Sequence, residues 1–465
     1  MRNINLTQGT IWKQVLSFAL PLFVVNLLQQ AYSVSDLIIV GNFSGVDAMA
    51  GIGASASLIS MIIGLAVGLA MGVSIVTVQA YSREDYDGLY KIVHTGYALA
   101  FVTGIALTLV GIFLAPVLLR LMNTPAEILP YAVKYLRIYF VSALPVVIYN
   151  IGAGILRGVG DIRHPFLFLS IGIILNIGLD FLFIGVFGWG VAGAAWAYVI
   201  AQLVTALLVT FSLATSLTPF RLFLADISFH RGILSKVLRV GVPAGIQAFA
   251  VALSNVFIQT AINRFGKHAV AGFSAAVKSD SFVFVLISGL AVAVMTFTSA
   301  NIGVCKADRV RRGLRQSLVL TFVLVTALSG LIILLRQPIA AAFNPDPQVT
   351  FYAMRTIVLL LSMYWIFALT EVIGGAIRGM GNSVFPMVVS LTCMAGFRLL
   401  WILVVLPVWH SLDAVIVAYP VSWAVSLVAY LIYLKVKGGI VPQRIFDEMC
   451  PQTDQATVCE QKPGV

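Results

Sequence analysis

The chain has 465 residues, of which 60% are hydrophobic and 10% are charged, and its formal net charge is +11. Soluble domains carry about 25% charged residues, so this composition excludes a soluble globular protein and indicates an integral membrane protein. The positive charge does not require nucleic acid as a partner, because basic residues between membrane spans also set the orientation of a membrane protein.

Twelve apolar runs are long enough to cross a bilayer, and several are long enough to tilt or bend. They cover residues 14–40, 48–80, 92–119, 128–151, 165–187, 190–215, 236–262, 269–302, 314–335, 350–374, 385–408 and 412–434. The sequence therefore predicts an all-α integral membrane protein with twelve transmembrane helices. A cleavable signal peptide is not expected, because the first run is too long for one and lacks a small-residue cleavage pattern.

The first run holds a proline followed by a polar stripe. Pro21 removes a backbone hydrogen bond inside the helix, so we expect a bend or hinge there. Spacings of three or four place four polar residues on one helix face: Asn26, Gln29, Ser33 and Asp36. A carboxylate deep in a span is costly and usually faces a cavity or an ion path. A structural hydrogen bond to a neighbouring helix is the competing interpretation of Asp36.

The fifth run carries a second buried acid. Asn176 and Asp180 are four residues apart and share one helix face, and Asp180 has no basic residue in its own run. Two buried carboxylates that repel each other can hold a proton near neutral pH, and a small cation could occupy the same oxygens. The sequence therefore predicts one proton or cation site at Asp36 and Asp180. Further oxygen ligands are offered by Asn26, Gln29, Tyr32, Ser33 and Asn176.

A polar, glycine-rich segment recurs along the chain. Residues 156–165 (LRGVGDIRHP) return at 377–386 (IRGMGNSVFP), where Gly, Gly and Pro keep their register. The same offset relates Pro21 to Pro243 within about one residue. Two homologous six-helix lobes are predicted, at 1–217 and 234–440, with a cytoplasmic linker at 218–233 and a disordered cytoplasmic tail at 441–465. Two parallel halves around a midplane site are typical of a secondary transporter.

The second half has different intramembrane charges. At offsets of 222 and 221 residues, Asp36 corresponds to Ile258 and Asp180 corresponds to Trp401. Its own charged residues within the spans are Lys278, Asp280, Glu371 and Arg398. We expect Glu371 to pair with Arg398 or Lys278. These charges could line a substrate chamber or form a structural ion pair, and the sequence leaves both interpretations open.

The basic residues predict the topology. If the N-terminus is cytoplasmic, the outer segments contain only Arg120, Lys134, Arg137, Arg264, Lys267, Arg336 and Arg355, whereas the other basic residues between spans lie inside. This bias predicts a multi-pass protein of the inner or plasma membrane with both termini in the cytoplasm.

The cysteines and histidines show no metal-ligand spacing. Free thiols are predicted for Cys305, Cys393, Cys450 and Cys459. The scattered histidines, His94, His164, His230, His268 and His410, lie near span ends and are interpreted as ordinary interfacial residues. We expect no cofactor and no metal, and with no paired-histidine or Gly-x-Ser-x-Gly motif we expect no enzyme.

Several of these motifs together resemble the multidrug and toxic compound extrusion (MATE) family. They are Pro21 and Asp36 in the first helix, the Arg157-Gly158-x-Gly160-Asp161 and Asn176-x-x-Leu179-Asp180 motifs, and, as in bacterial members, Arg398-Leu399-Leu400-Trp401 and Tyr419-Pro420-x-x-Trp423. The resemblance covers all of the chain except the tail. It implies a V-shaped pair of six-helix lobes and export of organic cations and lipophilic drugs in exchange for protons or sodium ions, by a monomer.

The resemblance also implies roles for single residues. The residue matched by Asp36 carries the coupling ion in the most similar branch, surrounded by residues matching Tyr32, Asn150, Asn176 and Asp180, with Tyr135 a further candidate. In another branch, acids on the seventh and tenth helices form a cation site. Glu371 matches the second of these acids, but the seventh helix offers only Gln247 and Asn255.

Other functions remain to be weighed against export. A lipid-linked precursor flippase of the same superfamily is the alternative, and it should need a basic central cavity, whereas only Lys278 and Arg398 lie deep. A channel would need rings of repeated filter groups, which two unlike halves do not supply.

Overall fold

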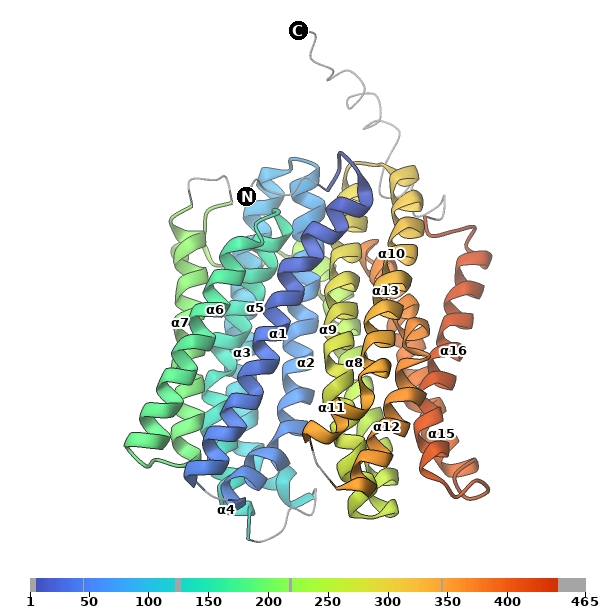
Figure 1. Cartoon of the computed structure of the whole chain (residues 1–465). Coiled ribbons are helices and arrows are strands. Elements are labelled where there is room, and N and C mark those ends of the chain that lie inside the picture. Colours follow the sequence, from blue (N-terminus) through green and yellow to red (C-terminus); the bar gives the residue numbers. More distant parts are fainter. Residues whose placement is uncertain (1–5, 45, 122–126, 217–219, 344–345, 442–465) are drawn as a thin grey trace. The chain divides into compact units, whose positions relative to one another are not determined.

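The computed structural model of the chain describes residues 6–44, 46–121, 127–216, 220–343 and 346–441 (Figure 1). Within these ranges it gives no side-chain description for residues 25, 31–51, 53, 54, 56, 57, 61, 62, 65, 121 and 267. The described part of the chain is helical, with short connections and no strand.

The helices, in chain order, are α1 (Ile11–Ser44), α2 (Val46–Ser82), α3 (Tyr86–Leu121), α4 (Leu129–Tyr139), η1 (Phe140–Ser142), α5 (Ala143–Gly158), α6 (Arg163–Asp180), η2 (Phe181–Val186), α7 (Val191–Ala214), η3 (Leu224–Asp226), α8 (Arg231–Ile262), η4 (Asn263–Phe265), α9 (Lys267–Gly303), α10 (Ala307–Leu334), α11 (Arg336–Phe343), α12 (Pro347–Leu361), α13 (Tyr364–Gly379), α14 (Val384–Val389), η5 (Ser390–Gly396), α15 (Phe397–Val404) and α16 (Leu412–Val436). Two of the short segments, η2 and η5, are π-helical.

The spans match the predicted apolar runs. Within the described residues ten segments are long and apolar enough to cross a membrane, and an eleventh is formed by α12 and α13, which are bent by 46°. Of α2, which is 37 residues long, the described apolar stretch at Ala66–Ser82 is shorter than these spans. The predicted all-α transmembrane fold is confirmed.

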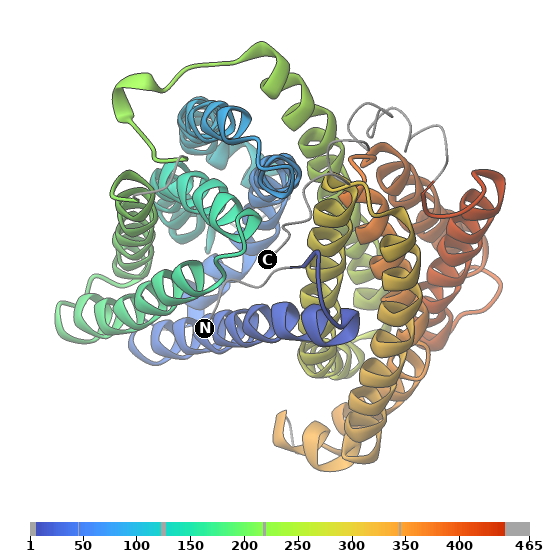
Figure 2. The ribbon, with the colours of Figure 1, turned by 90° about the horizontal axis from the view of Figure 1, so that it is seen from above.

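The chain forms two compact units. Of the described residues, those between 24 and 249 form one unit, and those at 6–23 and between 250 and 441 form the other. α1 and α8 therefore each contribute to both units. Pro21 and Pro243 lie inside these helices, shortly before the residues at which each helix passes from one unit to the other. Within the second unit α13 packs against α9, α10 and α16, as the view along the helices shows (Figure 2). The lobe limits at 1–217 and 234–440, with linker and tail, stay a prediction.

Glycines allow α2 and the first part of α8 to approach closely within the first unit. A Cβ atom added at Gly68 would lie 2.2 Å from the backbone nitrogen of Gly245, and one added at Gly72 would lie 2.5 Å from the carbonyl oxygen of Val237. The obstructing atoms are backbone, so the helices could not relieve the clash by a rotamer change. Small residues are a common device for such close packing in membranes.

We expect Gly68→Ala to lower the thermal stability of the detergent-purified protein, at a cost of roughly 1–3 kcal/mol for overpacking. Gly330→Ala is the matched control, because a Cβ atom there meets no atom within 4 Å, and alanine should favour the helix slightly. Melting curves of the two variants measure the difference. Equal melting temperatures would contradict the close approach of α2 and α8.

The recurring glycine-rich segments have the same backbone structure. Gly160 and Gly381 have φ angles of 85° and 86°. The next N–H group in each copy bonds back to the preceding helix, from Asp161 to the Leu156 oxygen at 2.9 Å and from Asn382 to the Ile377 oxygen at 3.3 Å. This is a helix stop that requires the left-handed conformation glycine adopts easily, which explains the shared glycine.

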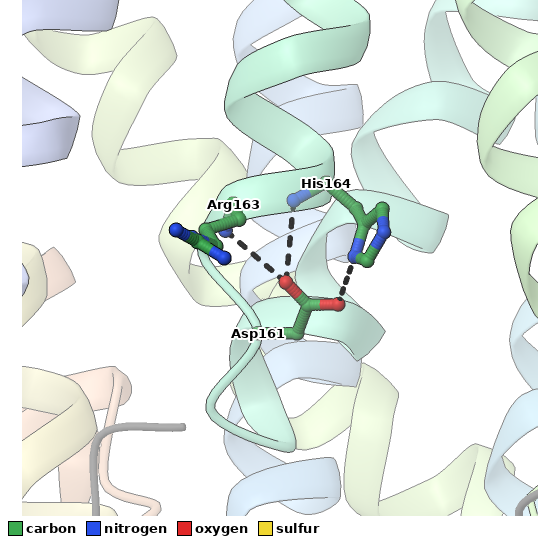
Figure 3. A network of polar contacts seen from close by, with 3 residues as sticks. All are labelled: Asp161, Arg163 and His164. Atoms are coloured by element: carbon green, nitrogen blue, oxygen red, sulfur yellow. Dashed lines mark hydrogen bonds and ion pairs between the residues drawn. The ribbon is translucent and has the colours of Figure 1, made fainter. Parts of the chain in front are cut away.

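Asp161 then starts the helix that carries the candidate site (Figure 3). Its Oδ1 atom accepts hydrogen bonds from the backbone N–H groups of Arg163 and His164 at 3.1 and 3.2 Å, and its Oδ2 atom contacts Nδ1 of His164. A carboxylate at the first turn satisfies donors that have no partner inside the helix. The second copy uses Asn382, whose Oδ1 accepts from Phe385 at 3.3 Å.

Two of the side-chain predictions need correction. His94 is not an interfacial residue but is fully buried, because its ring joins α3 to the chain segment after α7: Nε2 accepts from the Phe223 N–H at 3.1 Å and Nδ1 bonds to the Tyr90 oxygen at 2.8 Å. Cys305 is disulfide-bonded rather than free, a pairing that spacing in the sequence does not reveal. Cys393 is free as predicted, and Cys450 and Cys459 lie outside the described residues.

Candidate functional site

The first unit contains a buried amide–carboxylate pair on α6. Asp180 has no exposed surface, and Asn176 is 2% exposed. The Asn176 side-chain nitrogen donates a hydrogen bond to Oδ2 of Asp180 at 3.0 Å, as their spacing of four predicts. Asp180 is the last residue of α6, and the π-helical segment η2 begins directly after it. Irregular helix turns of this kind occur often at functional sites, because they re-aim side chains and backbone oxygens.

Three tyrosines of the first unit pack against one another. Tyr135 and Tyr139 on α4 are both buried, with ring centroids 5.7 Å apart, and Tyr139 stacks on Tyr198 of α7 at 4.6 Å. Asn150 on α5 is half-buried, and its side chain donates to the Val146 oxygen at 2.8 Å. Tyr135 is therefore a buried residue of the first unit.

The structure brings only Asn176 and Asp180 into direct contact among the predicted coupling residues it describes. Tyr32 and Asp36 lie on α1, but their side chains are outside the described residues. Asn26 is half-buried and Gln29 is exposed on the same helix. The contribution of the α1 residues Asp36 and Tyr32 to a site at Asp180 therefore stays a prediction.

In the second unit a buried guanidinium group is held by neutral partners. Arg398 is 3% exposed. Its Nε donates to the Ser422 hydroxyl at 2.9 Å, and its Nη1 donates to the Ser254 hydroxyl at 3.1 Å and to Oδ1 of Asn255 at 3.5 Å. The group also lies 4.3 Å from the ring centroid of Tyr419. Hydrogen bonds and a cation–π contact can stabilise a buried cation without a carboxylate.

An acid in the same unit is held by an aromatic cluster. Oδ2 of Asp280 accepts from the Tyr364 hydroxyl at 3.2 Å, and the Tyr364 ring packs edge-on against Trp423 at 5.2 Å. Trp423 also contacts Tyr419, the ring that Arg398 covers. Lys278, two residues from Asp280, is exposed. Asp280 and Arg398 therefore touch one cluster of aromatic side chains from different helices.

The predicted pairing of Glu371 with Arg398 or Lys278 is wrong. Oε2 of Glu371 lies 3.4 Å from Nη2 of Arg378, and the two side chains are 23% and 8% exposed. Both residues belong to α13, where a spacing of seven places them on the same face two turns apart. Arg378 lies in the recurring glycine-rich segment at 377–386, and its spacing of seven from Glu371 was the signal that could have revealed the pair.

The two repeats differ at this pair. The position of Glu371 corresponds to Asn150 in the first repeat, and Arg378 corresponds to Arg157. The first repeat therefore keeps the arginine but has a neutral amide that bonds its own backbone. An ionic contact within the helix is a feature of the second unit at this position.

Comparison with known sequences decides the family. The family model described as MatE matches residues 21–182 and 243–403, which together make up well over half of the chain. The chain belongs to the MATE family. The first matched segment of this MATE protein contains Asp36, Asn176 and Asp180, and the second contains Glu371 and Arg398.

Relatives of this MATE protein cover nearly its full length. It is 29% identical over 436 residues to the probable multidrug resistance protein YoeA of Bacillus subtilis. The aligned region covers 92% of this chain and 94% of the relative. It is 24% identical over 394 residues to an FAD transporter of Shewanella oneidensis, covering 83% and 86% of the two chains. A solved MOP superfamily transporter from Pyrococcus furiosus has the same fold, with a TM-score of 0.87, 23% identity and coverage of 96% and 98%. The protein is thus a multi-pass membrane transporter with the two-lobe, twelve-helix MATE fold.

Proposed function

We propose that this MATE protein is a secondary active antiporter that exports organic cations and lipophilic drugs in exchange for protons or sodium ions. The observation that carries the proposal is the fully buried Asp180, whose Oδ2 atom is hydrogen-bonded to Asn176 inside the first unit. Multidrug resistance relatives that cover nearly the whole chain support the substrate class.

The chemistry of the pair suits ion coupling. A carboxylate removed from water is stabilised when it binds a proton or a small cation, so its occupancy can respond to an ion gradient. The Asn176 amide orients one oxygen of Asp180, and Asp36 on α1 is proposed as the second acid of the same site. Tyr32, Asn150 and Tyr135 are proposed as its surrounding polar groups. No cofactor and no resident metal is needed for this exchange.

The second unit is proposed to serve substrate binding or closure. Its aromatic cluster at Tyr364, Tyr419 and Trp423 offers flat apolar surfaces, and Asp280 offers a charge that attracts cations. Glu371 and Arg398 are each held by partners within the unit, so the coupling step is assigned to the first unit.

Transport by right-side-out vesicles tests this function. Vesicles that contain the protein are loaded with a fluorescent organic cation, and its movement is followed under an imposed pH gradient and, separately, under an imposed sodium gradient. We expect one of the two gradients to drive efflux of the dye from the vesicles. Dye movement that ignores both gradients, together with gradient-free movement of an anionic lipid precursor, would favour the alternative, a lipid-linked precursor flippase.

The proposed orientation has both termini in the cytoplasm of a cell-membrane protein. Single cysteines placed at residues 3 and 455 in a cysteine-free background should resist an impermeant thiol reagent in intact cells and react after permeabilisation. A cysteine placed in the loop between α3 and α4 is the accessible control. Labelling of either terminus in intact cells would refute the topology.

A further inference from the structure

A surface pocket lies where α3 ends and α4 begins, in the first unit and away from the acids of the candidate site. Its volume is about 630 Å³, within the usual range of small-ligand pockets. Three basic side chains line it, Arg120, Lys134 and Arg137, together with an apolar wall formed by Pro116, Leu129, Pro130, Val133 and Ile138. None of the lining residues that the structure describes is acidic, so among them three positive charges are combined with a hydrophobic surface.

These three cations are distributed against the general bias of the chain. The predicted outer segments are poor in basic residues, yet three of the basic residues found there meet in this one pocket. Topology does not account for them, because positive charges on that side work against the orientation that the other basic residues favour. Nor does internal pairing: among the described residues the structure gives none of the three a hydrogen bond or an ion pair.

A second basic pocket, in the other unit, contains cations that form hydrogen bonds or ion pairs within the protein. It has a volume of about 510 Å³ and is lined by Lys306, Arg309, Arg311, Arg312 and the acid Asp308, among others. There Lys306 donates to the Thr7 oxygen at 3.1 Å, Arg309 donates to the Gln8 oxygen at 2.9 Å, and Arg311 pairs with Asp308 at 3.1 Å. These groups tie chain segments together, so their charges are used inside the protein.

We propose that the pocket at Arg120, Lys134 and Arg137 binds the phosphate headgroup of an anionic phospholipid. The three cations surround the phosphate, and an acyl chain lies along the apolar wall at Pro116 and Val133. α4 begins at the pocket, and its first turn has no side-chain cap, so the positive end of the helix adds to the attraction. A phospholipid fits better than a free anion, because a free anion would leave the apolar wall uncovered.

Native mass spectrometry of the delipidated, detergent-purified full-length protein tests the proposal. The probes are dioleoyl phosphatidylglycerol, dioleoyl phosphatidylcholine and inorganic phosphate. The test variant is Arg120→Gln/Lys134→Gln/Arg137→Gln. We expect the wild type to retain phosphatidylglycerol in preference to phosphatidylcholine. We expect the variant to bind phosphatidylglycerol about a hundredfold more weakly, because each of the three removed cations contributes a similar share of the attraction to an anionic lipid.

The matched control is Arg231→Gln/Lys236→Gln/Arg239→Gln. It likewise removes two arginines and one lysine, from exposed positions on α8 that line neither pocket, and it should bind phosphatidylglycerol as the wild type does. Arg120→Lys/Arg137→Lys retains the charges and should retain most of the binding. Equal binding by the test variant and the wild type would overturn the proposal, as would equal retention of the two lipids. Binding of inorganic phosphate as tight as that of the lipid would show a free-anion site instead.

A second measurement decides the matter if the triple variant does not fold. A photoactivatable phosphatidylglycerol is crosslinked to the wild-type protein in vesicles, and the modified peptides are sequenced. The proposal expects adducts in residues 116–138 that excess phosphatidylglycerol suppresses and excess phosphatidylcholine does not. Adducts confined to other segments would overturn it.

Discussion

Asp180→Asn is expected to reduce gradient-driven drug export to the level of vesicles without the protein, while the variant still folds and inserts. Asparagine has nearly the volume of aspartate and can keep a hydrogen bond to Asn176, so the packing of α6 on α7 should persist. It cannot exchange a proton or neutralise a cation, so the ion gradient loses its site of action. Dye efflux under the gradient that drives the wild type measures the effect.

Two variants make that result specific. Asp180→Glu keeps the ionisable group and should retain part of the activity, with an altered pH dependence. Asp87→Asn removes an exposed carboxylate that pairs with Lys91 on the surface of α3, and it should transport as the wild type does. Asp36→Asn should match Asp180→Asn if the two acids form one site. Full export by Asp180→Asn would remove this residue from the coupling step.

Glu371→Gln is expected to cause the second largest loss, because it removes the negative charge that lies 3.4 Å from Arg378, a side chain that is 8% exposed. Removing one partner of a buried ion pair costs several kcal/mol, and with Glu371 partly exposed we expect on the order of 2 kcal/mol. The measurements are the melting temperature and the amount of protein in the membrane. Transport should fall in proportion to the folded protein.

The double variant Glu371→Gln/Arg378→Gln should recover most of the lost stability, since no unpaired charge remains. Glu371→Gln/Arg398→Gln serves as the comparison, and it should be worse than either single change, because Arg398 has its own partners at Ser422 and Ser254. Rescue by Arg398→Gln and not by Arg378→Gln would contradict the pair within α13. A Glu371→Gln protein that is stable but loses gradient-driven export would move part of the coupling into the second unit.

The spans and the repeat could be predicted because both depend on local chemistry. Apolar length specifies which runs can cross a membrane, and the matching glycines at 160 and 381 report a backbone conformation that few other residues adopt. The Asn176–Asp180 contact followed from a spacing of four on one helix. In each case the interacting atoms are close in sequence.

Partners from other helices could not be predicted in the same way. Arg398 offers no sign in its own run that Ser254 and Ser422 would receive its hydrogen bonds, and Asp280 offers none that Tyr364 would. From sequence we expected Arg398 to form an ion pair with an acid. In the structure it is instead stabilised by hydrogen bonds to hydroxyl groups and by a contact with an aromatic ring. The burial of His94 was missed for a similar reason, since its partner Phe223 lies in a distant connecting segment.

Running the exchange in reverse tests most directly whether drug and ion movements are obligatorily coupled through Asp180. In proteoliposomes with no ion gradient, an imposed gradient of an organic cation should drive protons or sodium ions in the opposite direction, detected by an internal pH or sodium indicator. We expect this ion movement for the wild type and its absence for Asp180→Asn. Drug movement through the wild type without any counter-movement of either ion, or an unchanged ion movement in Asp180→Asn, would contradict it.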